Sequence, residues 1–113
     1  SGRFRYRREQ RLVGNDIAKV LSSRRRFKNS MFVVQLRANG LVLARLGLIV
    51  PKRFLHSSVS RNLAKRHVRE WFRMRQSKLV GHDILVRFVG PMSRTEDLLH
   101  NLNLIDLLND NPT

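Results

Sequence analysis

The pattern of apolar and polar positions predicts at least three strands. Residues 31–37 and 41–50 are rich in β-branched and other apolar residues, as strands usually are, and a turn sequence separates them. Residues 84–89 form another such run, which Gly90-Pro91 ends. Gly47, inside the second run, indicates a bulge or a close approach of the backbone to a neighbouring segment. The run 41–50 is long enough to be divided between two strands.

Two further segments show helical spacing. The first is expected to run from Asp16 to about Ser23, with Asn15 or Asp16 as its N-cap. The second begins at a capping box formed by Ser93 and Glu96. Its core-facing stripe consists of Leu98, Leu99, Leu102, Ile105 and Leu108. Together with the strands, these helices predict a small α+β sandwich, in which the helices pack on one face of a sheet and leave the other partly open.

Residues 57–76 predict a third helix, with Ser57 or Ser58 as its N-cap, whose two sides differ in kind. At 3.6 residues per turn, six polar residues fall within one arc of about 140°, and the apolar residues fall on the other side. The arc consists of Arg61, Asn62, Lys65, Arg66, Arg69 and Arg73. Glu70 is the only acid in the segment, so the opposite-charge pairs of an ordinary solvated face are scarce. Because like charges at this spacing repel, the arc favours contact with a polyanion.

Charge is unevenly distributed over the 113 residues, whose formal net charge is +15. Residues 1–82 hold 21 Lys/Arg against three acids, whereas residues 83–113 hold two against five. This asymmetry indicates a directed basic surface, with nucleic acid as the commonest partner and an anionic membrane surface as a weaker candidate. The absence of cysteine excludes disulfides and thiolate zinc sites and fits a cytoplasmic compartment. We see no membrane span and no signal peptide.

The chain is expected to be a single RNA-binding domain, residues 1–113. Ser1-Gly2 is typical of a scar from tag removal, residues 3–11 form a basic arm with two aromatic residues, and residues 109–113 form a frayed tail. Catalytic or metal-binding constellations are not evident, because the four histidines are scattered and the acids of the basic part are isolated. No phosphate-binding glycine loop is present.

Two motifs at a fixed separation resemble the bacterial ribonuclease P protein subunit. Residues 45–53 read RLGLIVPKR, and residues 61–73 read RNLAKRHVREWFR. The family patterns are R-x-G-L-x-V-x-K-K and R-N-R-x-K-R-x-x-R-E-x-F-R. Similarity also extends to the end of the arm, Arg8 to Leu12, and to the strand that begins at Asp83, so that nearly the whole chain is covered.

The resemblance implies a protein cofactor of a ribozyme endonuclease. In the family, the protein binds a large catalytic RNA that removes the 5′ leader from precursor tRNA in the cytoplasm, with one protein copy per RNA. The RNA and its Mg²⁺ ions supply the chemistry, so no catalytic residue, metal site or protein-bound cofactor is expected here. The implied fold is α-β-β-β-α-β-α, with a mixed sheet and a left-handed β-α-β crossover around the basic helix.

The resemblance also implies two RNA-contacting surfaces. Contacts with the catalytic RNA are expected from Lys52, Arg53, Arg61, Asn62, Lys65, Arg66, Arg69 and Arg73. A cleft between the first helix and the sheet is expected to hold the single-stranded leader, lined by Tyr6, Arg11, Ile17, Leu21, Phe32, Gln35 and Arg45. Leu63 stands where the family has an arginine. Because Ile17, Leu21 and Gln35 offer no aromatic face, base stacking is expected from Tyr6 and Phe32.

Two other classes of function remain open at this point. A ribosomal or general RNA-chaperone protein would share the basic surface, and a protein-only nuclease would act without a catalytic RNA. If the chain stimulates leader cleavage by a ribonuclease P RNA at low Mg²⁺, it is a ribonuclease P subunit rather than a general RNA chaperone. Specific cleavage by the chain alone would indicate a protein-only nuclease.

Overall fold

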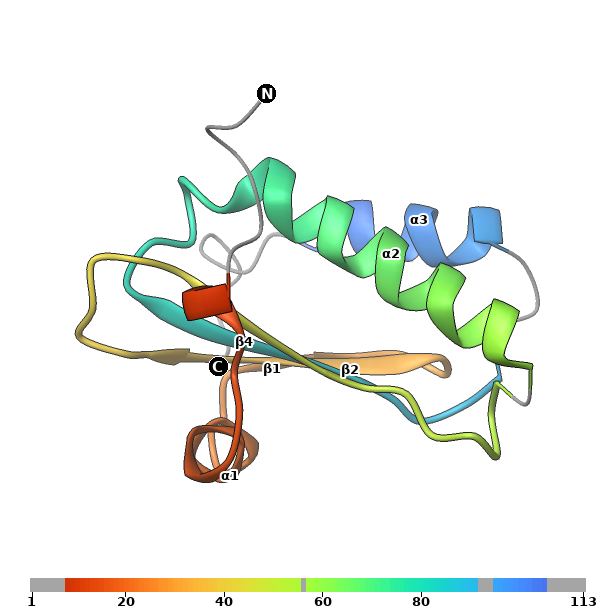
Figure 1. Cartoon of the computed structure of the whole chain (residues 1–113), viewed down its shortest axis with the longest axis horizontal. Helices are drawn as coiled ribbons and strands as arrows, with labels where there is room; N and C mark the ends of the chain where they lie inside the picture. Colours follow the sequence, from red (N-terminus) through yellow and green to blue (C-terminus); the bar gives the residue numbers. More distant parts are fainter. Residues whose placement is uncertain (1–7, 56, 92–94, 106–113) are drawn as a thin grey trace.

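The computed structural model describes residues 8–55, 57–91 and 95–105 (Figure 1). Its elements follow in this order: a 3-10 helix (Arg8–Gln10), α1 (Asn15–Leu21), β1 (Arg26–Lys28), β2 (Phe32–Ala38), β3 (Arg45–Ile49), α2 (Ser58–Arg75), β4 (His82–Phe88) and α3 (Thr95–Asn103). From α1 onward this is the order α-β-β-β-α-β-α, which confirms the expected fold class. Within the described ranges, no helix is both long and apolar enough to cross a membrane.

The four strands form one mixed sheet with the order β1-β2-β4-β3. β2 pairs antiparallel with β1 and with β4, whereas β3 and β4 are parallel. The chain therefore crosses from β3 to β4 through α2. Because Ile49 pairs with Arg87, the carboxyl ends of β3 and β4 lie at the same end of the sheet as the start of α2.

The extra strand does not come from residues 41–50, as the length of that run suggested. β3 occupies only Arg45–Ile49, and the additional strand is β1, in a stretch where the pattern predicted no strand. The sequence signal for β1 is weak, since one apolar residue, Phe27, stands between two exposed cations. Three residues are too few for a period of two to be recognised.

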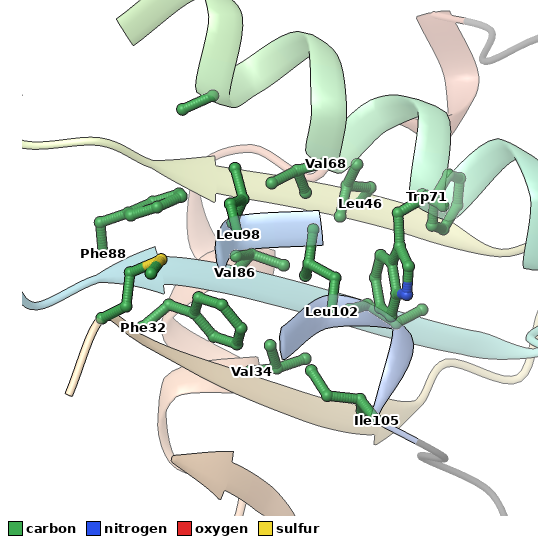
Figure 2. Packing of buried hydrophobic residues seen from close by; sticks show 14 of the residues in the cluster. Phe32, Val34, Leu46, Val68, Trp71, Val86, Phe88, Leu98, Leu102 and Ile105 are labelled. Atoms are coloured by element: carbon green, nitrogen blue, oxygen red, sulfur yellow. The ribbon is translucent and has the colours of Figure 1, made fainter. Parts of the chain in front are cut away.

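Alternate residues of the strands point toward α2 and α3 and form the main core (Figure 2). Phe32 and Phe88 are fully buried there and meet edge to face, with ring centroids 6.1 Å apart. The helices contribute Ala64, Val68, Trp71, Phe72, Leu98 and Leu102, all 4% exposed or less. Ile105, just after α3, is also buried, which confirms most of the predicted stripe. Leu108 and Ser93 lie outside the described residues.

α1 lies on the opposite face of the sheet, so the expectation that all helices share one face is wrong (Figure 1). A smaller cluster of Leu12, Val20 and Leu85, with Ile17 and Ile49 packed against it, attaches the helix. A Cβ at Gly47 would lie 3.0 Å from Leu85 Cδ1 and 3.1 Å from Leu12 Cβ. Gly47 therefore provides the close approach that the sequence indicated.

Candidate RNA interface

α2 presents a basic face on the side directed away from the core. The helix starts after Ser57, whose hydroxyl accepts a hydrogen bond from the Ser60 amide at 3.2 Å, which confirms one of the two predicted N-caps. On this face Asn62, Arg66 and Arg69 are exposed, and Arg61, Lys65 and Arg73 are half-buried. The opposite side of the helix is buried in the core, so the cations are held on a rigid, 18-residue support.

Two arginines of this face already have partners within the protein. Arg61 Nη1 donates to the Leu55 carbonyl at 3.0 Å, and Arg73 Nε donates to Glu70 Oε2 at 3.0 Å. The hydrogen bond from Arg73 lowers the pKa of the Glu70 carboxyl, and the same bond raises the pKa of Arg73. Because Glu70 neutralises Arg73, that side chain has less charge to offer an anion than its neighbours on the helix.

Lys52 and Arg53 extend the basic face beyond the start of α2. Both are exposed in the turn that joins β3 to α2. The Arg53 guanidinium lies over the Phe54 ring, 4.8 Å from its centroid, which restricts its orientation. These two cations therefore lie between the helix and the carboxyl end of β3.

Most of the residues predicted to line a leader cleft lie on the α1 side of the sheet, but two of them, Gln35 and Arg45, are engaged within the protein. Ile17 is half-buried and Leu21 is 39% exposed, and both belong to α1. Arg11 is exposed and forms a bridge with Leu46 at the edge of β3. Tyr6 lies outside the described residues.

The placement of Phe32 in this cleft is wrong. Phe32 is on the α2 side of the sheet, where it is completely buried against Phe88. Side chains alternate along a strand, so Phe32 and Gln35, three residues apart, must face opposite sides. This periodicity could have excluded the pairing of the two residues from the sequence alone.

Gln35 does lie on the α1 side, but its amide nitrogen is occupied. Its Nε2 donates to the carbonyl oxygens of Val20, Leu21 and Ser23 at 3.3, 2.9 and 3.2 Å. The residue is 1% exposed. Gln35 therefore fastens the carboxyl end of α1 to β2 and is not available to a ligand, contrary to the prediction.

Arg45 also has partners within the protein, two aspartates that would compete with the leader for its guanidinium. Its Nε and Nη2 donate to the two carboxylate oxygens of Asp83 at 2.8 and 2.7 Å, and its Nη1 donates to Asp16 Oδ2 at 3.2 Å. Asp83 is fully buried and also accepts from Asn39 Nδ2 at 2.9 Å. The hydrogen bond with Asp83 raises the pKa of Arg45. A buried carboxylate needs a cationic partner, and Arg45 supplies it.

Three cations on the α1 side were missed by the sequence analysis. They are Arg26 and Lys28 of β1 and Arg87 of β4. Lys28 pairs with Val33, which pairs with Arg87, and directly paired residues share a face of the sheet. Phe27 is partly buried on the core side. If β1 had been recognised as a strand, this apolar residue would have indicated that its two neighbours, Arg26 and Lys28, face the α1 side.

Comparisons with known proteins give a consistent result. The family model described as Ribonuclease P matches residues 6–109. The ribonuclease P protein component of Chromobacterium violaceum is 46% identical over 94 residues, covering 82% of this chain and 78% of that protein. That of Ralstonia pickettii is 38% identical over 96 residues, covering 84% of this chain and 69% of that protein.

Solved structures agree with these relatives. The Staphylococcus aureus RNase P protein superposes with a TM-score of 0.73 at 29% identity, covering 84% of this chain and 90% of that one. The Thermotoga maritima RNase P protein gives a TM-score of 0.56 at 30% identity, covering 91% and 84%. The similarity therefore includes the sequence and the fold.

Proposed function

The chain belongs to the ribonuclease P protein family, and on that basis we propose which of its surfaces contacts which RNA. As a family member it is a subunit of the ribonuclease P holoenzyme, an endoribonuclease, and acts as an RNA-binding cofactor in the maturation of tRNA 5′ ends. Our proposal is that the basic face of α2 binds the catalytic RNA and that the α1 side of the sheet binds the 5′ leader of precursor tRNA.

The observation that carries the first assignment is the basic face of α2. Lys65, Arg66 and Arg69 project from a helix whose other side is fixed in the core, and the one acid of α2 is already paired with Arg73. Phosphates neutralise such a row of like charges and release counterions from the RNA. Asn62, Arg61, Lys52 and Arg53 belong to the same proposed surface.

The α1 side of the sheet supports the second assignment with a different set of residues. Ile17 and Leu21 offer partly exposed apolar surface for bases or sugars, and Arg11 is exposed nearby on the edge of β3. Arg26, Lys28 and Arg87 replace Arg45 as the cations of this face. Tyr6 remains the proposed stacking residue of the arm.

The chemistry in this proposal belongs to the RNA. Mg²⁺ is assigned to the RNA because the family resemblance implies it. Among the described residues, no group of three or more His, Cys, Asp or Glu gathers that could hold a metal ion. The role of the protein is then to position RNA. One protein copy per RNA and a cytoplasmic location are parts of the same proposal, since bacterial tRNA precursors are made and matured there.

The experiment that tests this function is stimulation of a ribonuclease P RNA. At low Mg²⁺, the chain should raise the rate of leader cleavage and should make the complex bind precursor tRNA more tightly than mature tRNA. A general RNA chaperone would leave the preference for the precursor unchanged, and no stimulation at all would contradict the proposal. Specific 5′ cleavage by the chain after rigorous removal of RNA would indicate a protein-only nuclease.

A further inference from the structure

Two apolar residues lie at the surface of α2 beside its basic face. Val59 is 74% exposed, and Leu63 is half-buried. They are one helical turn apart, so their Cβ atoms are about 5–6 Å from each other and the side chains form one apolar pair. Among the described residues, the two apolar clusters of the sheet include partly buried side chains such as Leu48 and Val50, but neither cluster includes Val59 or Leu63. The core therefore does not account for this pair.

Asn62 and Arg66 complete a small surface around the pair. Asn62 follows Val59 by three residues, and Arg66 follows Leu63 by three, so all four side chains are neighbours on one side of the helix. Both Asn62 and Arg66 are exposed. We call these four residues the α2 patch. The patch offers an apolar surface, an amide that both donates and accepts hydrogen bonds, and a guanidinium.

This combination goes beyond what phosphate binding requires. The family pattern has an arginine at position 63, whereas the aliphatic Leu63 cannot bind a phosphate. A regular RNA duplex presents phosphates and 2′-hydroxyl groups and keeps the faces of its bases stacked inside. An unpaired nucleotide exposes a base face, which apolar side chains remove from water, and a base edge, which accepts and donates hydrogen bonds. The α2 patch therefore matches the base face, the base edge and the phosphate of one such nucleotide.

We propose that the α2 patch binds one unpaired nucleotide of the catalytic RNA. The base lies on Val59 and Leu63, Asn62 hydrogen bonds to its edge, and Arg66 binds the adjacent phosphate. The proposal rests on the assignment of α2 to the catalytic RNA given above, because the patch is continuous with the basic face. It adds a contact that depends on the pairing state and identity of a single nucleotide, whereas the basic face responds to charge alone.

Salt dependence and the accessibility of RNA bases provide the test, with the full chain bound to a ribonuclease P RNA. V59A/L63A should weaken binding by roughly 3- to 30-fold, a part of what full burial of two aliphatic side chains contributes. The slope of log K against log salt should stay unchanged, because an apolar contact releases no counterions. Chemical probing should find one unpaired base that the parent protects and V59A/L63A leaves reactive. Leu63→Met keeps the apolar volume and should retain both the affinity and the protection.

The matched control is L41A/V42A, which truncates the same two residue types at exposed positions between β2 and β3. It should follow the parent in affinity, salt slope and base protection. A flatter salt slope in V59A/L63A, or a loss of affinity without a newly reactive base, would overturn the α2 patch. Alanine is a good helix former, so α2 should persist in V59A/L63A, and thermal melting checks this.

A second variant separates the patch from the function on which it rests. K65A/R69A removes two cations of the basic face and leaves the α2 patch intact. If K65A/R69A lost affinity while V59A/L63A bound like the parent, the α2 patch would be wrong and the assignment of α2 to the catalytic RNA would stand. If K65A/R69A also bound like the parent with an unchanged salt slope, the proposed function of α2 would itself fail.

Discussion

The two faces of the sheet are built from the same strands but differ in the interactions that attach the helices to them. Toward α2 and α3, the described residues form one apolar cluster of 18 buried side chains, whereas the cluster under α1 has three. The remaining attachment of α1 is polar, through the Gln35 amide and the Asp16–Arg45 ion pair. Most of the stability therefore resides on one face, which leaves the other open to charged and polar residues.

The difference extends to the use of charge. On α2 the basic residues are displayed at the surface of a helix whose position the core already fixes. On the α1 side, one arginine, Arg45, serves the fold, because it compensates the buried Asp83, while Lys28 and Arg87 have no such partner among the described residues. A positive residue in a family motif can thus be structural, and only its surroundings distinguish the two roles.

The largest expected effect concerns stability on the core face. Leu102→Ala should lower the free energy of unfolding by about 2–5 kcal/mol, because a fully buried leucine loses its transfer energy and leaves a cavity. Ile17→Ala, at a half-buried residue packed against the small cluster under α1, should cost clearly less. Urea unfolding with an unchanged m-value measures both. Similar losses for the two variants would show that the α1 side contributes as much stability as the core face.

The elements that the sequence could predict are those with a long, regular pattern of apolar and polar residues. α2 and β2 were anticipated to within about two residues at each end, because each presents a long pattern with a clear break. Gly47 was interpreted correctly, since a glycine in a strand is costly unless space requires it. The motifs at residues 45–53 and 61–73 were sufficient to identify the family.

Tertiary pairing explains what it could not predict. β1 is too short to show a period, and the pairing of Arg45 with Asp83 joins residues 38 positions apart. The cap of α1 was also misassigned: Gly14 precedes the helix with φ near +60°, and Asp16 instead accepts a hydrogen bond from Arg45. For Arg45 and Asp16, a partner distant in sequence decided the role.

The next effect concerns RNA affinity on α2. Replacing Lys65, Arg66 and Arg69 with Ala should weaken binding to the catalytic RNA and flatten the slope of log K against log salt by about 2–3, since each lost phosphate contact contributes about 0.7–0.9. The fold should persist, because the change relieves like-charge repulsion. Replacing Arg26, Lys28 and Arg87 with Gln is the control, and it should leave binding of the catalytic RNA alone nearly unchanged. Equal losses would contradict the division of roles between the two faces.

Arg45 could either position α1 or contact phosphate, and the sign of a smaller change in affinity for precursor tRNA distinguishes the two roles. Asp16→Asn breaks the tie between α1 and Arg45 but keeps the two hydrogen bonds from Arg45 to Asp83. If Arg45 only positions α1, affinity for precursor tRNA should fall by roughly two- to fivefold, as for one partly exposed ion pair. If Arg45 contacted phosphate, losing a competing carboxylate would raise affinity. Glu9→Gln removes the same charge from an exposed position outside this network and corrects for the change in net charge.

The smallest effect is expected at the one acid of the basic face. Glu70→Gln should free Arg73 and steepen the salt slope for the catalytic RNA by at most about 0.7–0.9, the contribution of one phosphate contact. Arg73→Gln should have little effect in the parent but should abolish the gain in the Glu70→Gln background, which a double-mutant cycle measures.

The hydrogen bond from Arg73 lowers the pKa of Glu70 in the folded protein, so the pair is intact above the ordinary glutamate range, about 4.3, and is lost as the pH falls through the lowered value. The affinity of the parent should therefore approach that of Glu70→Gln only at a pH below the ordinary glutamate range. A gain that survived Arg73→Gln would show that the carboxylate of Glu70 repels RNA directly and that Arg73 is not its target.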